Sequence, residues 1–209
     1  YRRASAGASC TMTTRPRGDA RFCGTTASMC GVEKAGFCHD RQAMEEAVRL
    51  DTMLHAFMLF QSGIPVLYSG DEVGQVNDYT YKEKPEKAAD SRYIHRGDFQ
   101  WELAERINEP ETVQNHIFHN LERLEAIRAG EPLLDAECPF RTLEIWDSSV
   151  LGMVRQDGRG RKNSLVYLIS AENAALRGLM KRTVCTGIWL QETSWKHPAS
   201  VCLVTDFCG

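Results

Sequence analysis

Two neighbouring carboxylates, Asp71 and Glu72, are the first residues whose type suggests chemistry. They follow a short apolar run at residues 64–68, which predicts a strand that ends beside them. A retaining glycosidase needs two carboxyl groups about 5 Å apart that face each other across one bond. Neighbouring residues of a strand point to opposite faces. We therefore expect this pair to make hydrogen bonds at the edge of a site and not to be the catalytic pair.

A third carboxylate, Asp40, stands directly after His39. A catalytic Asp of a barrel lies at the end of a strand, yet residues 31–36 before it are turn-like in composition. A helical pattern begins directly after Asp40 and leaves no loop for a site. The sequence therefore predicts that Asp40 caps the N-terminus of that helix.

His116 and His119 lie one helical turn apart, as a pair of metal ligands would. No Cys or carboxylate with ligand spacing accompanies them, so we expect them on the solvated face of a helix. The sequence predicts no metal site and no cofactor.

The elements that must position these residues alternate between helix and strand. Apolar residues recur at helical spacing from Arg41 until Ser62 and Gly63 end the pattern. A helix followed at once by a short apolar strand is typical of a parallel sheet or barrel. The polar, aromatic stretch 75–110 is long for a connection, which favours a functional loop. A second helix opens at Pro110 and closes at Gly130.

The pattern changes to short alternating runs after about residue 131. These runs, at 142–146, 150–155 and 164–169, predict strands, and residues 157–160 carry a turn signal. We therefore expect a β-domain at 131–209, after an α/β part at 19–130.

The segment Gly63-Ile-Pro-Val-Leu-Tyr-Ser-Gly-Asp-Glu72 is similar to the eighth strand of the alpha-amylase superfamily (glycoside hydrolase family 13), where the pattern is Gly-x-Pro-x-x-Tyr-x-Gly-x-Glu. Asn77-Asp78, Ala89-Asp-Ser-Arg92 and His95-Arg96 extend the likeness toward the amylosucrase branch. The match runs in order over residues 19–175. It implies the C-terminal piece of a (β/α)8 TIM barrel that ends near Gly130, followed by a truncated antiparallel β-sandwich.

The resemblance also implies where a sugar would bind. The arginine that matches Arg92 contacts the sugar next to the cleaved bond, and a planar guanidinium suits adjacent hydroxyls. A salt bridge from Arg92 to Asp90 or Asp98 is the alternative. The candidate substrate-binding residues are Tyr68, Asp71, Glu72, Asp90, Arg92 and Arg96.

The catalytic residues of the family, a nucleophilic Asp and an acid/base Glu, lie upstream of its eighth strand. We therefore expect this chain to be a fragment without catalytic residues, inactive alone, of an enzyme that acts on sucrose, maltose or glucan. The alternative is a non-catalytic carbohydrate-binding or interaction module, in which aromatic residues of the 75–110 loop stack on sugars: Tyr79, Tyr81, Tyr93 and Trp101.

Both ends of the chain depart from the family pattern. Residues 1–18 have no apolar period, and residues 1–17 and about 180–209 back-translate in a shifted frame to strings like those of the family. We therefore hypothesise that both ends come from a disrupted reading frame. Four of the eight cysteines would then have no evolved role: Cys10, Cys185, Cys202 and Cys208.

Composition excludes several classes of partner. A net charge of −3 argues against binding to nucleic acid or an anionic membrane surface, and no apolar run is long enough to span a bilayer. The cysteine spacing fits free thiols in a reducing compartment, which predicts a cytoplasmic location. A fragment of a barrel leaves its strand without neighbouring strands. We therefore expect exposed apolar patches around residues 57–68, and aggregation of the isolated chain.

Overall fold

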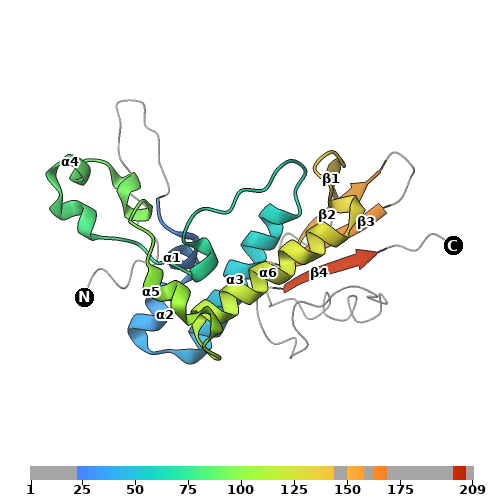
Figure 1. Ribbon diagram of the computed structural model, residues 1–209. Coiled ribbons are helices and arrows are strands. Elements are labelled where there is room, and N and C mark those ends of the chain that lie inside the picture. The colour runs from blue at the N-terminus through green and yellow to red at the C-terminus, as the bar shows by residue number, and fades with distance from the viewer. Residues whose placement is uncertain (1–22, 144–149, 158–161, 169–199, 206–209) are drawn as a thin grey trace. The chain divides into compact units, whose positions relative to one another are not determined.

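The computed structural model describes residues 23–143, 150–157, 162–168 and 200–205 (Figure 1). The chain divides into two compact units. The first takes in residues 1–51 and 67–119, and the second takes in residues 52–66 and 120–209. The stretch 1–17 and most of 180–209, on which the reading-frame hypothesis rests, lie outside the described residues.

Two short helices precede the predicted one in the first unit: α1 (Thr26–Cys30) and α2 (Val32–Cys38). The prediction that residues 31–36 form a turn was wrong. Gly31 has a φ of 103°, a left-handed angle that commonly ends a helix. It is both the C-cap of α1 and the N-cap of α2. The hydroxyl of Thr25 accepts a hydrogen bond from the Ser28 amide and caps α1.

Helix α3 (Arg41–Leu59) confirms the helical pattern and ends four residues before Gly63. The carboxylate of Asp40 accepts a hydrogen bond of 3.0 Å from the amide of Ala43. This is the geometry of an N-cap, and it confirms the predicted role of Asp40.

Residues 64–68 contain no strand in the structure, contrary to the prediction. Among the described residues none of their backbone amides donates a hydrogen bond, and Ile64 and Val66 are 86% and 76% exposed. A strand needs a neighbour that satisfies its backbone groups, and the described part of the chain offers none here. The expected exposure of apolar residues around 57–68 is confirmed in part, since Phe57 and Tyr68 are exposed as well, whereas Leu59 and Phe60 are buried.

The loop 75–110 folds into short helical turns. In chain order these are η2 (Thr80–Glu83), α4 (Pro85–Ala88), η3 (Ser91–His95), α5 (Trp101–Ala104) and η4 (Glu105–Asn108). Before them stands η1 (Asp71–Val73), which ends at Gly74 with a φ of 61°. A Cβ at Gly74 would lie 2.6 Å from Cδ1 of Ile117, so this position needs glycine for its space as well as its backbone angle.

Helix α6 (Val113–Gly130) is the second predicted helix, capped by the hydroxyl of Thr112. In the second unit α6 lies beside the end of α3 (Figure 1), and Asn120 donates a hydrogen bond of 3.0 Å to the Thr52 hydroxyl. The turn η5 (Pro132–Leu134) follows and buries Leu133 and Leu134.

Two arginines hold the carbonyl groups that follow the C-terminal end of α3. The guanidinium of Arg128 donates to the carbonyls of Leu59, Gln61 and Gly63. Arg155, whose side chain is fully buried, donates to the Phe60 carbonyl at 2.8 Å and to the Asp135 carbonyl. Because the last carbonyls of a helix have no partner within it, these bonds fix where α3 ends.

The β-part is a four-stranded antiparallel sheet in the order β1–β2–β3–β4. Its strands are β1 (Phe140–Leu143), β2 (Val150–Gln156), β3 (Lys162–Leu168) and β4 (Ser200–Thr205). The first three confirm the predicted strands within a few residues. The pair Val154 and Ser164 sets the register of β2 and β3, and Ser164 pairs with Val204 of β4. Residues 200–205, in the tail predicted to be out of frame, thus form a strand that pairs with β3.

No helix among the described residues is long and apolar enough to cross a bilayer. The described cysteines Cys23, Cys30, Cys38 and Cys138 are free thiols, as the sequence predicted.

Candidate functional site

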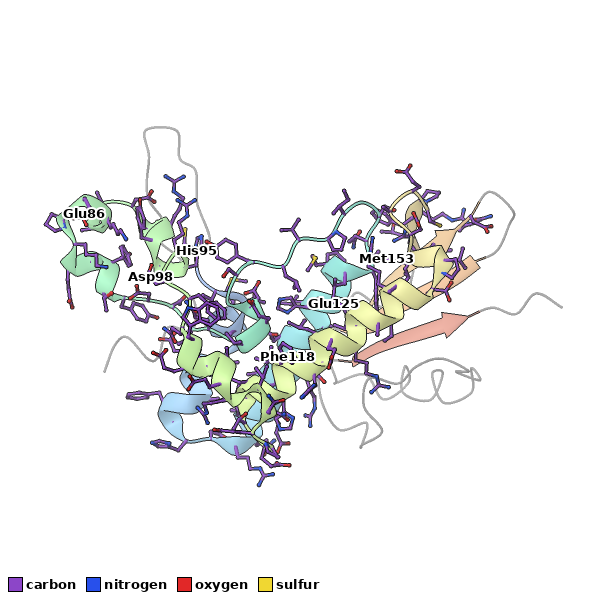
Figure 2. The ribbon with its side chains drawn as sticks, viewed as in Figure 1. Glu86, His95, Asp98, Phe118, Glu125 and Met153 are labelled. Atoms are coloured by element: carbon purple, nitrogen blue, oxygen red, sulfur yellow. The ribbon has the colours of Figure 1, made fainter. Side chains whose placement is uncertain are left out.

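Among the six predicted substrate-binding residues, Tyr68 contacts the ring of His95 at the end of η3, and the charges of Asp71, Asp90, Arg92 and Arg96 act on the pKa of that histidine. The ring of Tyr68 meets the His95 ring edge-on, with 5.8 Å between the ring centroids. Figure 2 labels His95 on η3. A backbone hydrogen bond holds η3 near the residues that follow η1: the Asp78 amide donates to the Ile94 carbonyl at 2.8 Å.

Burial lowers the pKa of His95, and the neighbouring guanidinium of Arg96 lowers it further. The carboxylates of Asp90 and Asp71 act on the pKa in the opposite direction, and Arg92 adds to the lowering. The ring is therefore neutral at pH 7. Its Nδ1 atom is buried and has no hydrogen-bond partner among the described residues. A buried polar atom without a partner is costly, which makes Nδ1 a candidate for contact with a ligand.

Arg92 forms a two-pronged ion pair with Asp90. Its Nε atom lies 2.9 Å and its Nη2 atom 2.6 Å from the Asp90 carboxylate. The same carboxylate accepts a hydrogen bond from the Arg92 amide at 3.0 Å and so caps η3. The side-chain hydrogen bond from Arg92 holds the pKa of Asp90 well below its ordinary range. The predicted alternative for Arg92, a salt bridge to Asp90, is therefore present. The Nη1 atom of Arg92 takes no part in it.

Arg96 lies over the Tyr93 ring, 6.0 Å from its centroid, and Lys87 lies over the same ring at 5.2 Å. Such cation–π contacts hold long side chains in place near a surface. Arg96 is exposed, so its guanidinium is open to a ligand that reaches the end of η3.

Asp71 and Glu72 lie in the turn η1, not in an extended strand as predicted. Glu72 accepts a hydrogen bond of 2.7 Å from the Gly70 amide. This bond stabilises the turn. Asp71 is the member of the pair that acts on the pKa of His95.

The aromatic residues proposed for sugar stacking are mostly used in packing. Tyr81 is 4% exposed and forms a core cluster with Cys23 and Ile94, against which Tyr79 and Tyr93 pack. A buried ring cannot offer its face to a sugar, so Tyr81 is excluded from that role. Trp101 is 72% exposed and meets Phe99 edge-on, with 4.8 Å between the ring centroids.

His116 and His119 are both exposed on α6, as predicted. Among the described residues no cluster of three His, Cys, Asp or Glu side chains could hold a metal ion.

His95 is the residue that sequence reasoning passed over. It stood in the pair His95-Arg96 that extended the family likeness, but it was not among the candidate residues. Its burial and its unpartnered Nδ1 depend on the contacts of η3 with residues before it in the chain, and spacing alone does not reveal these.

No family model matches the chain. A curated relative is the glucosylglycerate phosphorylase of Escherichia coli (strain K12), which is 27% identical over 117 residues. The match covers 56% of this chain and 20% of the relative, so the chain spans about a fifth of the length of that protein.

Two solved structures are similar to this chain at lower identity. A trehalulose synthase variant in complex with Tris is 18% identical with a TM-score of 0.46, and the match covers 84% of this chain and 39% of that one. Amy13B of Eubacterium rectale is 17% identical with a TM-score of 0.47, over 89% of this chain and 38% of that one.

Proposed function

Because the chain belongs to the alpha-amylase superfamily, glycoside hydrolase family 13, we propose that it supplies part of the sugar-binding side of an enzyme that cleaves or transfers glucosyl groups. The chemistry we propose is that of a retaining enzyme, with a covalent glucosyl intermediate. Within the family, the motif likeness favours the amylosucrase branch.

The observation that carries this proposal is the group of side chains around His95. Sugar hydroxyls both donate and accept hydrogen bonds, and a neutral imidazole offers one donor and one acceptor. The buried Nδ1 of His95 lacks a partner that a hydroxyl would provide. Arg92 and Arg96 add charged donors, which make stronger hydrogen bonds than neutral groups.

The ion pair with Asp90 and the sugar contact of Arg92 are compatible. Asp90 engages the Nε and Nη2 atoms of Arg92, which fixes the plane of the guanidinium. A fixed plane loses less side-chain entropy when a ligand binds, so the ion pair prepares Arg92 for a hydroxyl on its remaining edge. In this proposal Asp90 is a positioning residue and Arg92 is the contact.

The nucleophile and the acid/base carboxylate come, in this proposal, from residues outside this chain. Asp71 and Glu72 are neighbours in one turn and do not flank a bond, and Asp40 caps a helix. Residues 19–130 would complete a (β/α)8 barrel, with 64–68 as its eighth strand once neighbours are present, and residues 131–209 would form the C-terminal β-domain.

The alternative, a non-catalytic sugar-binding module, has less support. It requires a face of exposed aromatic rings, and only Trp101 of its four aromatic residues is described as strongly exposed. The site around His95 depends instead on charged and polar groups at the end of a short helix.

The test measures turnover and binding by the purified chain. We expect no release of glucose or fructose from sucrose or maltose, but measurable maltose binding by calorimetry. Arg92→Gln should weaken that binding about tenfold or more, because a charge-assisted hydrogen bond contributes about 1.5–3 kcal/mol. The matched control is Arg41→Gln, since Arg41 is highly exposed and pairs with Glu45 on a helix surface.

Turnover by the chain alone would contradict the claim that the catalytic carboxylates lie elsewhere. Equal maltose binding by Arg92→Gln and the parent chain would contradict the assignment of Arg92.

A further inference from the structure

The exposure of residues 64–68, in the loop that follows α3 (Figure 1), alternates along the chain. Ile64, Val66 and Tyr68 are 86%, 76% and 48% exposed. The intervening Pro65 and Leu67 are partly buried. A period of two is that of an extended chain, in which every second side chain points to the same side. The segment therefore presents one continuous apolar face although it belongs to no sheet among the described residues.

Both ends of this segment are held by other parts of the chain. The Gly63 amide donates to the Ala136 carbonyl at 3.0 Å, and the Gly63 carbonyl accepts a hydrogen bond of 2.7 Å from Arg128. At the other end the Tyr68 carbonyl accepts a hydrogen bond of 3.0 Å from the Asp71 amide. A segment that is held at both ends has already lost part of its conformational freedom, so it loses less entropy when it pairs with another strand.

The two edges of the segment differ in their backbone groups. In an extended chain the amide and carbonyl of one residue point to one edge, and those of the next residue point to the other. The edge of Ile64, Val66 and Tyr68 carries three amides, and none of them donates a hydrogen bond among the described residues. The opposite edge consists of Pro65 and Leu67, and proline has no amide hydrogen to donate. Only the first edge is therefore suited to pair with another strand.

A second copy of the same segment is complementary to that edge. When two copies run antiparallel about a two-fold axis at Val66, each Val66 lies opposite its own copy, and each Ile64 lies opposite the Tyr68 of the other chain. An aromatic residue opposite a β-branched residue is a favourable cross-strand pair. The Val66 amides and carbonyls bond across the axis, and each Tyr68 amide reaches an Ile64 carbonyl. Residues 62–70 carry no charged side chain, so the pairing places no like charges opposite each other.

We propose that residues 64–68 form a two-stranded antiparallel sheet with the same segment of a second chain, with the two-fold axis at Val66. Pairing stops at two chains, because Pro65 lies on the outer edge of each strand and prevents a further strand from joining. The interface has five residues from each chain, against about 20–30 in a standard interface, so the dimer is weak and reversible.

This dimer goes beyond the function proposed for the residues around His95, because it uses none of their charged groups. Barrel strands that paired with residues 64–68, as the proposed function requires, would occupy the same edge and exclude the dimer. The dimer is therefore a property of this chain without the rest of a barrel.

The first test compares two proline variants of the full chain by sedimentation velocity over a range of concentrations. We expect the parent chain to pass from monomer to dimer as its concentration rises. Val66→Pro removes the amide at the two-fold axis and should weaken dimerisation about tenfold or more, because two hydrogen bonds are lost. Leu67→Pro is the matched control, since the amide of Leu67 lies on the unused edge, and it should change the dimer affinity less than about twofold.

The second test uses a disulfide to measure the register. Opposite residues of a hydrogen-bonded antiparallel pair have Cα atoms about 5.5 Å apart, within the range that a disulfide spans. Val66→Cys should therefore give a covalent dimer on oxidation, with the bridge between the two introduced thiols located by mass spectrometry. Leu67→Cys should not bridge to itself, because the same position of the second chain lies diagonally opposite, about 7–8 Å away.

A chain that stays monomeric at all concentrations would overturn the proposal, as would a dimer that Val66→Pro leaves unchanged or growth to large species without a dimer. Equal bridging by Val66→Cys and Leu67→Cys would overturn the antiparallel register, since parallel strands in register place every residue opposite its own copy. Arg92→Gln should leave the dimer affinity unchanged while it weakens maltose binding, so failure of the dimer and failure of the sugar site are distinguishable.

Discussion

The loop at residues 70–100 and the segment at 64–68 are adjacent in sequence but are held in opposite ways. In the loop, side chains bond to the backbone at each turn: Gln75 bridges to Asp98 and Gln100, and Asn77 bridges to Thr25 and Ser28. The segment 64–68 has apolar side chains in solvent and no backbone hydrogen bond of the strand kind. The loop is specified by its own residues and their neighbours, whereas the segment needs a strand partner.

This difference shows which part of the chain can keep its shape unaided. Side-chain to backbone bonds replace the regular ladder of secondary structure in the loop, so the groups around His95 are positioned without a complete barrel. The segment before it is held at its two ends: Gly63 donates to the Ala136 carbonyl and accepts from Arg128, and the Tyr68 carbonyl accepts a hydrogen bond from the Asp71 amide.

The largest effect is expected from Gly74→Ala. An alanine would have to adopt a φ of 61° and would place its Cβ 2.6 Å from Cδ1 of Ile117. The left-handed angle and the overpacking together should lower the free energy of unfolding by about 2–4 kcal/mol, measured by urea denaturation. Gly130→Ala is the matched control, because a Cβ there meets nothing within 4 Å. Equal stability of both variants would contradict the account of the loop.

Asn77→Ala should have the next largest effect. The Asn77 side chain is 7% exposed and accepts a hydrogen bond of 2.8 Å from the Thr25 amide. Its loss leaves a buried donor without a partner and should cost about 1–3 kcal/mol in urea denaturation. Asn108→Ala, at an exposed position, should change stability by less than about 0.5 kcal/mol.

Acid should destabilise the region around His95 in two steps. The folded-state pKa of His95 is lowered below its ordinary value of about 6.5, so the unfolded chain binds the proton first and stability falls as the pH drops below that value. Asp90 also has a lowered pKa, so its contribution is present above about pH 3.9 and is lost below it. Urea midpoints between pH 7 and 5 test the first step.

His95→Gln removes the titrating ring and should flatten the pH dependence between pH 7 and 5. A slope that persists unchanged in this variant would show that another group causes it.

The smallest effect on stability is expected from Ile64→Thr combined with Val66→Thr. Both side chains are largely exposed, so the free energy of unfolding should change by less than about 0.5 kcal/mol per substitution. Self-association measured by light scattering should nevertheless decrease, because an exposed apolar patch on an unpaired segment promotes aggregation. A large loss of stability would mean that the segment is packed after all.

Sequence patterns located the elements whose causes are local. Helical periodicity found α3 and α6, alternation found three strands, and the Asp40 cap followed from the residues around it. The strand at 64–68 was wrong because strand formation depends on a partner elsewhere. The helical turns of 75–110 and the role of His95 depend on contacts between distant residues, such as Thr25 with Asn77, which no spacing encodes.

The central claim is that the residues around His95 bind a sugar. NMR signals of the His95 ring, recorded during a titration with maltose, test it most directly because the buried Nδ1 is the atom that lacks a partner. The account predicts a saturable shift of the His95 signals that is lost in Arg92→Gln. His95 signals that stay unchanged throughout the titration would contradict it.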